Sequence, residues 1–477
     1  MSFVRWLVAF LGLMVLASGV EGAQAEDANP NDPALFIPAP TSEQSLLQAI
    51  GPGQGPRRAH SDKADVHKGV SGYSPARRCL SCHEGQQNNL HYARTTLRCR
   101  DCHISDPIAG IRNPKATMFA EHRAEKVCAR CHEGAGPGMA SYVIHEQAPW
   151  SAAIQADFPA LYWSTFVMLL LAGTVFLIFL PYTGIWALRE IGHRWRHRRE
   201  PKAASESVLV ERFSAPERIF HTLLVVCFMA LSVTGVAWMY IETGLGGALA
   251  TPFGGYEGTI FVHRAFGVIL MAAFALHILY LIRSVLRKGN RELTGPDSLV
   301  WTWADFRAFH AHLKWLVGLG GHPVFDRWTW WQKFDYWAVW WGLVIVGSTG
   351  ILLFDPVLTA EFLPGWTMNV ARWVHKVEAV LAMGHIFIVH FFIESYRPSA
   401  FPLNDHVFHG AARLEDLERE HPAWIARLEA DGNLSDRMTA QPPKLVQAAF
   451  FSFGFSMVLL GLALLAAMAV YAVDLSL

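Results

Sequence analysis

Charged residues are scarce in this sequence. Asp, Glu, Lys and Arg make up 17% of the 477 residues, acidic and basic residues are equal in number, and the formal net charge is zero. A protein that binds nucleic acid presents an excess of Lys and Arg to the phosphates, so the composition excludes nucleic acid as an expected partner. A chain that is instead 52% hydrophobic and contains 18 Trp is typical of a membrane protein embedded in the lipid bilayer.

The first 25 residues predict a secretory signal peptide. Arg5 precedes a short apolar run, and the small residues around Ala23 and Ala25 are typical of a cleavage site after Ala25. The apolar run is short for a membrane span, which makes an uncleaved anchor the less favoured alternative. We therefore expect residues 26–150 to be exported.

Cysteine is also rare, and six of the seven cysteines lie between Cys79 and Cys131. Exported cysteines usually form disulfides, but C-x-x-C-H, the attachment signature of c-type haem, occurs three times here, as CLSCH, CRDCH and CARCH. The sequence therefore predicts three covalent haems. Their thioether bonds would use Cys79, Cys82, Cys99, Cys102, Cys128 and Cys131, and their proximal iron ligands would be His83, His103 and His132.

Each of these irons needs a sixth ligand or keeps an open position. The favoured distal ligands are His91 and His122, which lie shortly before the next motif, followed by His145 and His67, with His60 the weakest candidate. Ligation by two histidines closes the iron and makes an electron-transfer centre. Because residues 26–150 contain few large apolar side chains, we expect a loop-rich domain with short helices wrapped around the haems.

Residues 151–477 predict a bundle of membrane-spanning helices, so the expected fold class is mostly α, with the multihaem c domain followed by six spans. Each of six apolar runs is long enough to cross a bilayer; they cover 161–187, 217–241, 258–283, 334–354, 370–395 and 446–473. The loops at 242–259 and 355–371 contain no Lys or Arg, whereas the other connections are basic. The positive-inside rule then places the c domain and the C-terminus outside the bacterial inner membrane.

Histidines form two levels within these spans. His263 and His375 lie near the outer face, and His390 lies 15 residues beyond His375, about 22 Å further along a helix. His221 and His277 both lie near the inner face. This ladder suits two stacked b-type haems held by histidine pairs from facing helices. The outer pair is His263 with His375, and the inner pair is His390 with either His221 or His277.

Other features have simpler interpretations. His385 lies at mid-depth and is expected to pack or to carry protons, and Cys227 is expected to pack in the core. Residues 301–318 are Trp-rich and amphipathic, which favours a helix on the inner membrane surface. Residues 412–432 alternate charges at helical spacing and predict a solvated helix.

Four stretches of the bundle resemble the dihaem cytochrome b subunit of membrane-bound formate dehydrogenases and nickel-iron hydrogenases. They are ERIFHTLLVVCFMALSVTG (217–235), FVHRAFGVIL (261–270), WTWWQKFDYWAVWWGLVIVGSTGILLF (328–354) and ARWVHKVEAVLAMGHIFIVHFF (371–392). The resemblance centres on a dihaem core at 210–400. The first span (161–187), the last span (446–473) and the c-haem segment have no counterpart in that family.

The resemblance implies roles for individual residues. It pairs His221 with His390 at the inner haem and His263 with His375 at the outer haem, and His277 has no equivalent in the family. The spacing between His375 and His390 is one residue longer than the family pattern. The family exchanges electrons with quinone beside the inner haem, which makes Gln332 and Lys333 candidates for a quinone site; interfacial anchoring is the alternative for both.

These features predict a membrane cytochrome of a respiratory chain that carries electrons between the quinone pool and periplasmic c haems. The alternative is an anchor and relay subunit, without catalysis of its own, for a separate periplasmic oxidoreductase. Its partners would be membrane quinone and a periplasmic redox protein or further subunits. No motif suggests a molybdenum, nickel or nucleotide site, and the sequence leaves the direction of electron flow open.

Overall fold

The computed structural model describes Cys102 and residues 117–146, 148–196, 208–241, 243–289 and 291–474, all within one compact unit of the chain. The predicted signal peptide at 1–25 lies outside the described residues. So do most residues of the first two haem motifs and several candidate distal ligands, namely Cys79, Cys82, His83, Cys99, His103, His60, His67 and His91.

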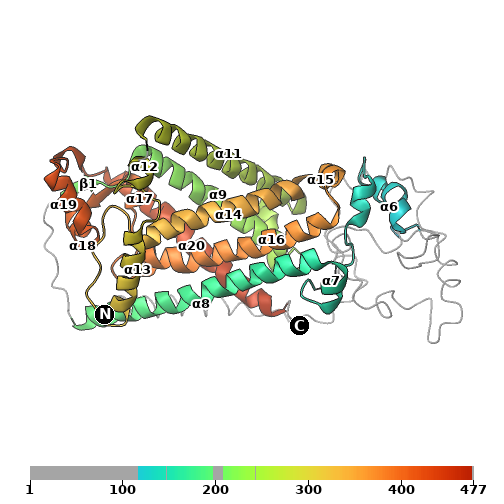
Figure 1. Ribbon diagram of the computed structural model, residues 1–477, viewed down its shortest axis with the longest axis horizontal. Coiled ribbons are helices and arrows are strands. Elements are labelled where there is room, and N and C mark those ends of the chain that lie inside the picture. The colour runs from blue at the N-terminus through green and yellow to red at the C-terminus, as the bar shows by residue number, and fades with distance from the viewer. Residues whose placement is uncertain are drawn as a thin grey trace. The chain divides into compact units, whose positions relative to one another are not determined.

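Within the described residues, six helices are long and apolar enough to cross a membrane, which confirms the mostly helical six-span prediction. Five are single α-helices and the sixth, α16, continues through two π-helical segments, η6 and η7 (Figure 1). Their bounds are α8 (Pro159–Arg196), α9 (Ala215–Met239), α11 (Tyr256–Lys288), α14 (Trp330–Phe354), α16 (Trp366–Gly384) with η6 (His385–His390) and η7 (Phe392–Tyr396), and α20 (Lys444–Asp474).

The composition of the spans explains why they are helical. A backbone in lipid must satisfy its own hydrogen bonds, and large apolar side chains then face the lipid. Leu177 of α8 and Leu286 of α11 are 75% and 81% exposed. Local signals set the helix starts: Ser214 and Glu217 form a reciprocal capping box at α9, and Thr329 caps α14.

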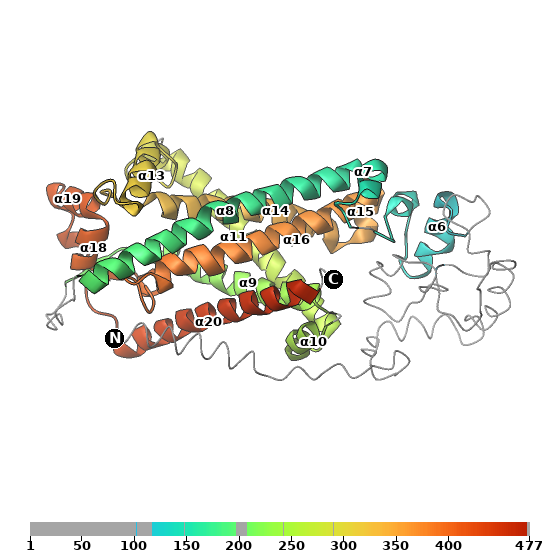
Figure 2. The same cartoon turned by 90° about the horizontal axis from the view of Figure 1, so that it is seen from below.

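The bundle packs α9 against α11, α14 against α16, and α16 against α8, while α20 lies along α9 (Figure 2). Two glycines allow close helix contacts. A Cβ on Gly384 of α16 would lie 2.4 Å from Phe176 of α8, and one on Gly461 of α20 would lie 2.7 Å from Phe387. Cys227 is fully buried in an apolar cluster, as expected.

One end of the bundle, the α7 end, carries the segment that contains the third haem motif (Figure 1). Its short elements are α6 (Ala120–Lys126), η3 (Cys128–Arg130), η4 (Pro137–Ser141), α7 (Ala152–Asp157), α10 (Gly244–Ala250), η5 (Thr251–Phe253) and α15 (Pro356–Phe362). Gly138 of η4 lies so close to α15 that a Cβ there would be 2.0 Å from the Ala360 carbonyl oxygen. The motif segment therefore packs directly on the bundle.

The opposite end, the α13 end, carries a small polar cap. It consists of α12 (Arg291–Thr294), α13 (Trp303–Leu316), α17 (His406–His409), α18 (Leu414–Glu420), α19 (Pro422–Ala430), η8 (Ser435–Arg437) and an antiparallel sheet ordered β2 (Ala411–Arg413), β1 (Leu209–Glu211) and β3 (Met438–Thr439). Val210 of β1 pairs with Ala412 and Met438. The helix expected over 412–432 is interrupted at Pro422, which begins α19.

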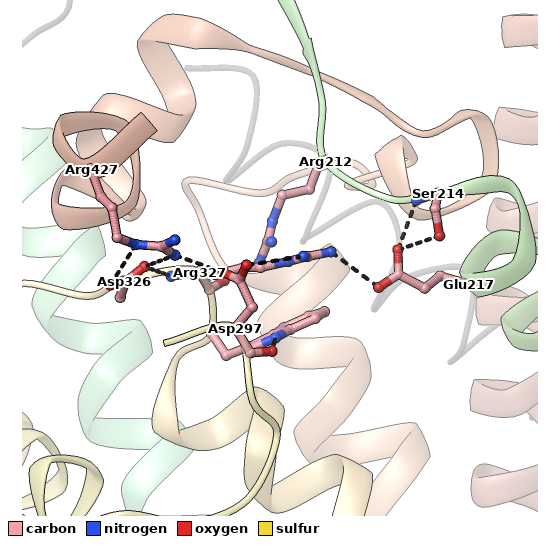
Figure 3. A network of polar contacts seen from close by, with 8 residues as sticks. Arg212, Ser214, Glu217, Asp297, Asp326, Arg327 and Arg427 are labelled. Atoms are coloured by element: carbon pink, nitrogen blue, oxygen red, sulfur yellow. Dashed lines mark hydrogen bonds and ion pairs between the residues drawn. The ribbon is translucent and has the colours of Figure 1, made fainter. Parts of the chain in front are cut away.

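Ion pairs hold this cap to the bundle (Figure 3). The Arg427 guanidinium lies 2.6 Å from Asp297 and 2.8 Å from Asp326, and Arg327 lies 3.1 Å from Glu217 at the start of α9. Arg212 donates to the Arg327 carbonyl, and burial lowers the pKa of Arg212 to about 9. Segments far apart in sequence are thus joined into one cap.

The amphipathic helix α13 differs in one respect from the expectation of a helix lying on the surface. Its His312 is fully buried, with Nδ1 3.1 Å from the Tyr182 hydroxyl and the ring packed against Trp186 and Trp331. Burial lowers the pKa of His312 to about 3, so this imidazole is neutral. Through His312, α13 therefore packs directly on α8 and α14.

Candidate functional site

His263 of α11 and His375 of α16 face each other at the α7 end of the bundle. Their ring centres lie 6.4 Å apart with an interplanar angle of 64°. Two imidazoles on opposite faces of one metal, each with a metal–nitrogen bond of about 2.0 Å, have ring centres roughly 6 Å apart. The pair therefore has the spacing that a bis-histidine haem requires.

A threonine on a neighbouring helix contacts each of these histidines. Thr234 Oγ1 of α9 lies 2.8 Å from His263 Nδ1, and Thr349 Oγ1 of α14 lies 3.0 Å from His375 Nδ1. Each hydroxyl also donates to a carbonyl one turn earlier in its own helix, at 2.7 Å in both cases. A hydroxyl has one hydrogen, so each threonine must accept from the histidine Nδ1–H.

This hydrogen bonding determines the tautomer of both imidazoles. With the proton on Nδ1, the lone pair lies on Nε2, which is the form that ligates a metal. A glycine follows each threonine, and a Cβ on Gly235 or Gly350 would lie 3.6 or 3.5 Å from the Cε1 atom of the adjacent histidine. The backbone of α9 thus packs against His263, and the backbone of α14 packs against His375 in the same way.

A second group of histidines surrounds Asp335 of α14, nearer the α13 end. Asp335 Oδ2 lies 3.0 Å from His390 Nδ1, and its Oδ1 lies 2.9 Å from His385 Nε2. His221 of α9 is near enough to His390 to interact with it electrostatically. Among the described residues, the buried His221 Nδ1 has no hydrogen-bond partner.

His277, the alternative inner ligand, has different surroundings. Its Nε2 lies 2.9 Å from the Tyr336 hydroxyl, and its ring stacks on Phe220 with the ring centres 4.6 Å apart. His277 is therefore held by aromatic residues of neighbouring helices.

The two candidate quinone residues take part in contacts within the protein. The Gln332 side chain accepts from the Thr329 backbone N–H and completes the cap of α14. Lys333 Nζ lies 2.9 Å from Asp305 Oδ2 of α13 and 3.2 Å from the Val300 carbonyl oxygen. These bonds anchor the start of α14 to α13.

Lys333→Met should destabilise the protein by about 3–5 kcal/mol, because it leaves a buried Asp305 carboxylate without its ion-pair partner. Adding Asp305→Asn should recover most of that loss, since the amide oxygen can still accept the helix-capping bonds from Thr302. Thermal unfolding followed by tryptophan fluorescence measures both variants. Wild-type stability of the single variant would show that the pair contributes nothing.

The third haem motif lies against the bundle at the α7 end. Its Cys128, Cys131 and His132 are at or beside η3, and Gly134, with φ +84°, would place a Cβ 3.5 Å from Val357 of α15. Burial raises the pKa of the Cys128 thiol and lowers the pKa of His132, which keeps this imidazole in the neutral, ligating form.

The same segment is bonded to the helix that carries His375. Val143 exchanges two hydrogen bonds with Asn369 of α16, of 3.1 and 3.0 Å, and Glu146 lies 2.7 Å from Arg372 and 2.6 Å from Asn369. Asn369 is fully buried. The candidate distal ligands His122, on α6, and His145, beside Glu146, belong to this docked segment.

Sequence reasoning did not single out Thr234, Thr349 or Asp335. The signals that could have found them are the Thr-Gly pair within two separate spans and a carboxylate inside an apolar helix. Among the described residues, no three His, Cys, Asp or Glu side chains gather to hold a bare metal ion. His263 and His375 instead form a facing pair.

Comparison with known proteins gives matches in this part of the chain. Residues 212–395 match the family model described as prokaryotic cytochrome b561. The formate dehydrogenase cytochrome b556(fdo) subunit of Escherichia coli strain K12 is 23% identical over 181 residues, which covers 38% of this chain and 75% of the relative. The subunits of that name from the O6:H1 and O157:H7 strains match equally. Residues 212–395 are therefore a cytochrome b561-type membrane electron-transfer segment related to the cytochrome b subunit of formate dehydrogenase.

Proposed function

We propose that this protein is a quinone-linked respiratory cytochrome that carries electrons between the membrane quinone pool and three c-type haems, through two b-type haems. The observation that carries the proposal is the facing pair of His263 and His375. Their spacing suits bis-histidine ligation, and both rings are held in the ligating tautomer. The haems supply one-electron chemistry, while the protein holds them in line.

The ligands of the second b haem would be His390 and His221. Asp335 orients His390, as carboxylates commonly orient metal-bound histidines. His221 interacts with His390, whereas the Nε2 of His277 is bonded to Tyr336. These contacts support His221 over His277 as the partner of His390.

The α7 end would face the periplasm and the α13 end the cytoplasm of a bacterial inner membrane. The Lys- and Arg-free loops at 242–259 and 355–371 support this orientation. The segment that directly follows the third c-type motif packs on α15 through Gly134 and Gly138 and bonds to α16 through Val143, within two turns of His375. Electrons would therefore pass between the outer b haem and this c haem.

The quinone would bind at the α13 end, beside the haem held by His390. Gln332 and Lys333 lie at this end, but their polar atoms are bonded within the protein. The Lys333→Met/Asp305→Asn double variant separates the two roles. If its stability is recovered while the KM for a quinol analogue rises, Lys333 contacts the quinone, and an unchanged KM would make it an anchor alone.

A relay role within a larger enzyme is the second candidate function. The relatives named above are subunits of formate dehydrogenase, so this chain could serve a separate periplasmic oxidoreductase in the same way. Native-gel purification from the source membranes tests this: a second large redox subunit that comigrates stoichiometrically supports the relay role, and an active cytochrome alone refutes it.

The haem content tests the main proposal directly. The full chain should contain five haems, three that stay covalently bound and two that acid–acetone extracts, as measured by pyridine haemochrome spectra. Quinol should reduce all five. Absence of extractable haem b would refute the ligand assignment and leave the histidines as helix-packing groups.

A further inference from the structure

We propose that the groups behind the axial histidines give the b haem near the α13 end a lower reduction potential than the b haem near the α7 end, so that electrons run downhill from quinol to the c-type haems. The inference rests on the proposed function, because it takes His390 and the pair His263 and His375 as ligands. It concerns three residues that contact the axial histidines but would not themselves bind iron: Asp335, Thr234 and Thr349.

At the α13 end an ionised side chain supports the ligand. Asp335 accepts from His390 Nδ1–H at 3.0 Å, and its other oxygen accepts from His385 Nε2–H at 2.9 Å, so both oxygens point at imidazoles. A carboxylate bonded to Nδ1–H raises the basicity of the ligating nitrogen and thereby stabilises ferric iron. These two hydrogen bonds also hold Asp335 in place within an apolar bundle.

Charged groups of both signs are present at this end. Arg397 pairs with Glu420 at 3.3 Å and with Glu190 at 4.0 Å, and the Arg218 guanidinium donates to the His409 carbonyl. Asp335 is therefore the carboxyl side chain that bonds the ligand directly.

At the α7 end the groups that support the ligands are neutral. Thr234 and Thr349 accept from the histidine Nδ1–H groups with uncharged hydroxyls, which polarise an imidazole less than a carboxylate does. Arg264 directly follows His263 and stacks over Phe354 at 5.1 Å. Lys376 directly follows His375 and lies over Trp373 at 5.1 Å, and the buried Glu378 lies three residues beyond His375. The charges at this end are therefore of both signs, and the hydroxyls are the groups that bond the ligands directly.

A carboxylate behind His390 and hydroxyls behind His263 and His375 would therefore give the two haems different potentials, with the lower one at the α13 end. Oxidation of one quinol to quinone at the α13 end releases two protons and two electrons, and each electron finally reduces one ferric c-type haem. A haem reduction potential that rises from the α13 end to the α7 end favours electron flow from quinol to the c-type haems over flow from the c-type haems to quinone. The side chains thus assign quinol as the donor and the c haems as the acceptor.

Redox titration of the full chain in membranes, followed in the b-haem absorption band, tests the inference. The wild type should show two b haems of different potential, and His375→Ala should remove the higher one. Asp335→Asn should raise the lower potential enough to change the ratio of reduced to oxidised haem about tenfold, which is about 59 mV for one electron. It should leave the higher potential unchanged. Asp416→Asn, a carboxylate of the cap that pairs with Arg419, should shift neither.

Further variants keep the test decisive if Asp335→Asn binds haem poorly. Asp335→Glu should keep the low potential, Thr349→Val should alter only the higher potential, and Thr349→Ser should restore it. The inference fails if the two wild-type potentials coincide, if the α13-end haem is the higher, if Asp335→Asn moves the other haem, or if Asp335→Asn and Asp335→Glu both lose haem. The proposed function fails separately, if the wild type contains no b haem to titrate.

Discussion

His375→Ala should remove one b haem and cut the c-type haems off from the quinone pool. The imidazole is one of two facing ligands on different helices, and a methyl group provides no ligand for the iron. Extractable haem should fall from two to one per chain, while the remaining b haem is still reduced by quinol. Reduction of the c haems by quinol, followed in their own absorption band by stopped flow, should fall to the level of a sample without quinol.

The exposed His310 of α13 is the matched control, because His310→Ala removes an imidazole outside the bundle interior. It should retain both b haems and the wild-type rate. His263→Ala should repeat the His375→Ala result, since it removes the opposite ligand. Reduction of the c haems at the wild-type rate in either ligand variant would contradict the proposed route.

His221→Ala should abolish reduction of every haem by quinol, because the haem that it would ligate is the first electron acceptor. Of the two b haems, only the one at the α7 end should stay bound, as acid–acetone extraction and the low-temperature b-band spectrum would show. Chemical reductant should still reduce the remaining haems. Reduction by the chemical reductant would show that the protein is folded and that only electron transfer from quinol is lost.

His277→Ala is the comparison that makes this result informative. It breaks a hydrogen bond to Tyr336 and should cost about 1–3 kcal/mol in stability, with both b haems retained. The opposite pattern, in which His277→Ala loses a haem and His221→Ala keeps it, would overturn the pairing of His221 with His390.

Much of the architecture follows from local sequence alone. Six apolar runs of sufficient length require six helices in a bilayer, because no other structure satisfies the backbone of a single segment there. The structure confirms each run as a helix. All six helices begin two to four residues earlier than predicted, where caps such as Ser214 and Thr329 set the first turn. At the other end, α8 continues nine residues further and α9 stops two residues earlier. The haem motifs and the histidine ladder are likewise visible as spacings along the chain.

The environment of each histidine could be decided only by the tertiary structure. Thr234 and His263 are 29 residues apart, and Asp335 and His390 are 55 apart; their contacts depend on how the helices rotate and cross, which no local period specifies. His277 and His221 lie at similar depths by sequence, yet Tyr336 faces only the first. The local pattern of residues specifies which helices form and which imidazoles they carry. The packing decided which nitrogen is protonated and which charge lies behind it, because hydrogen bonds between helices set the tautomer and the local field.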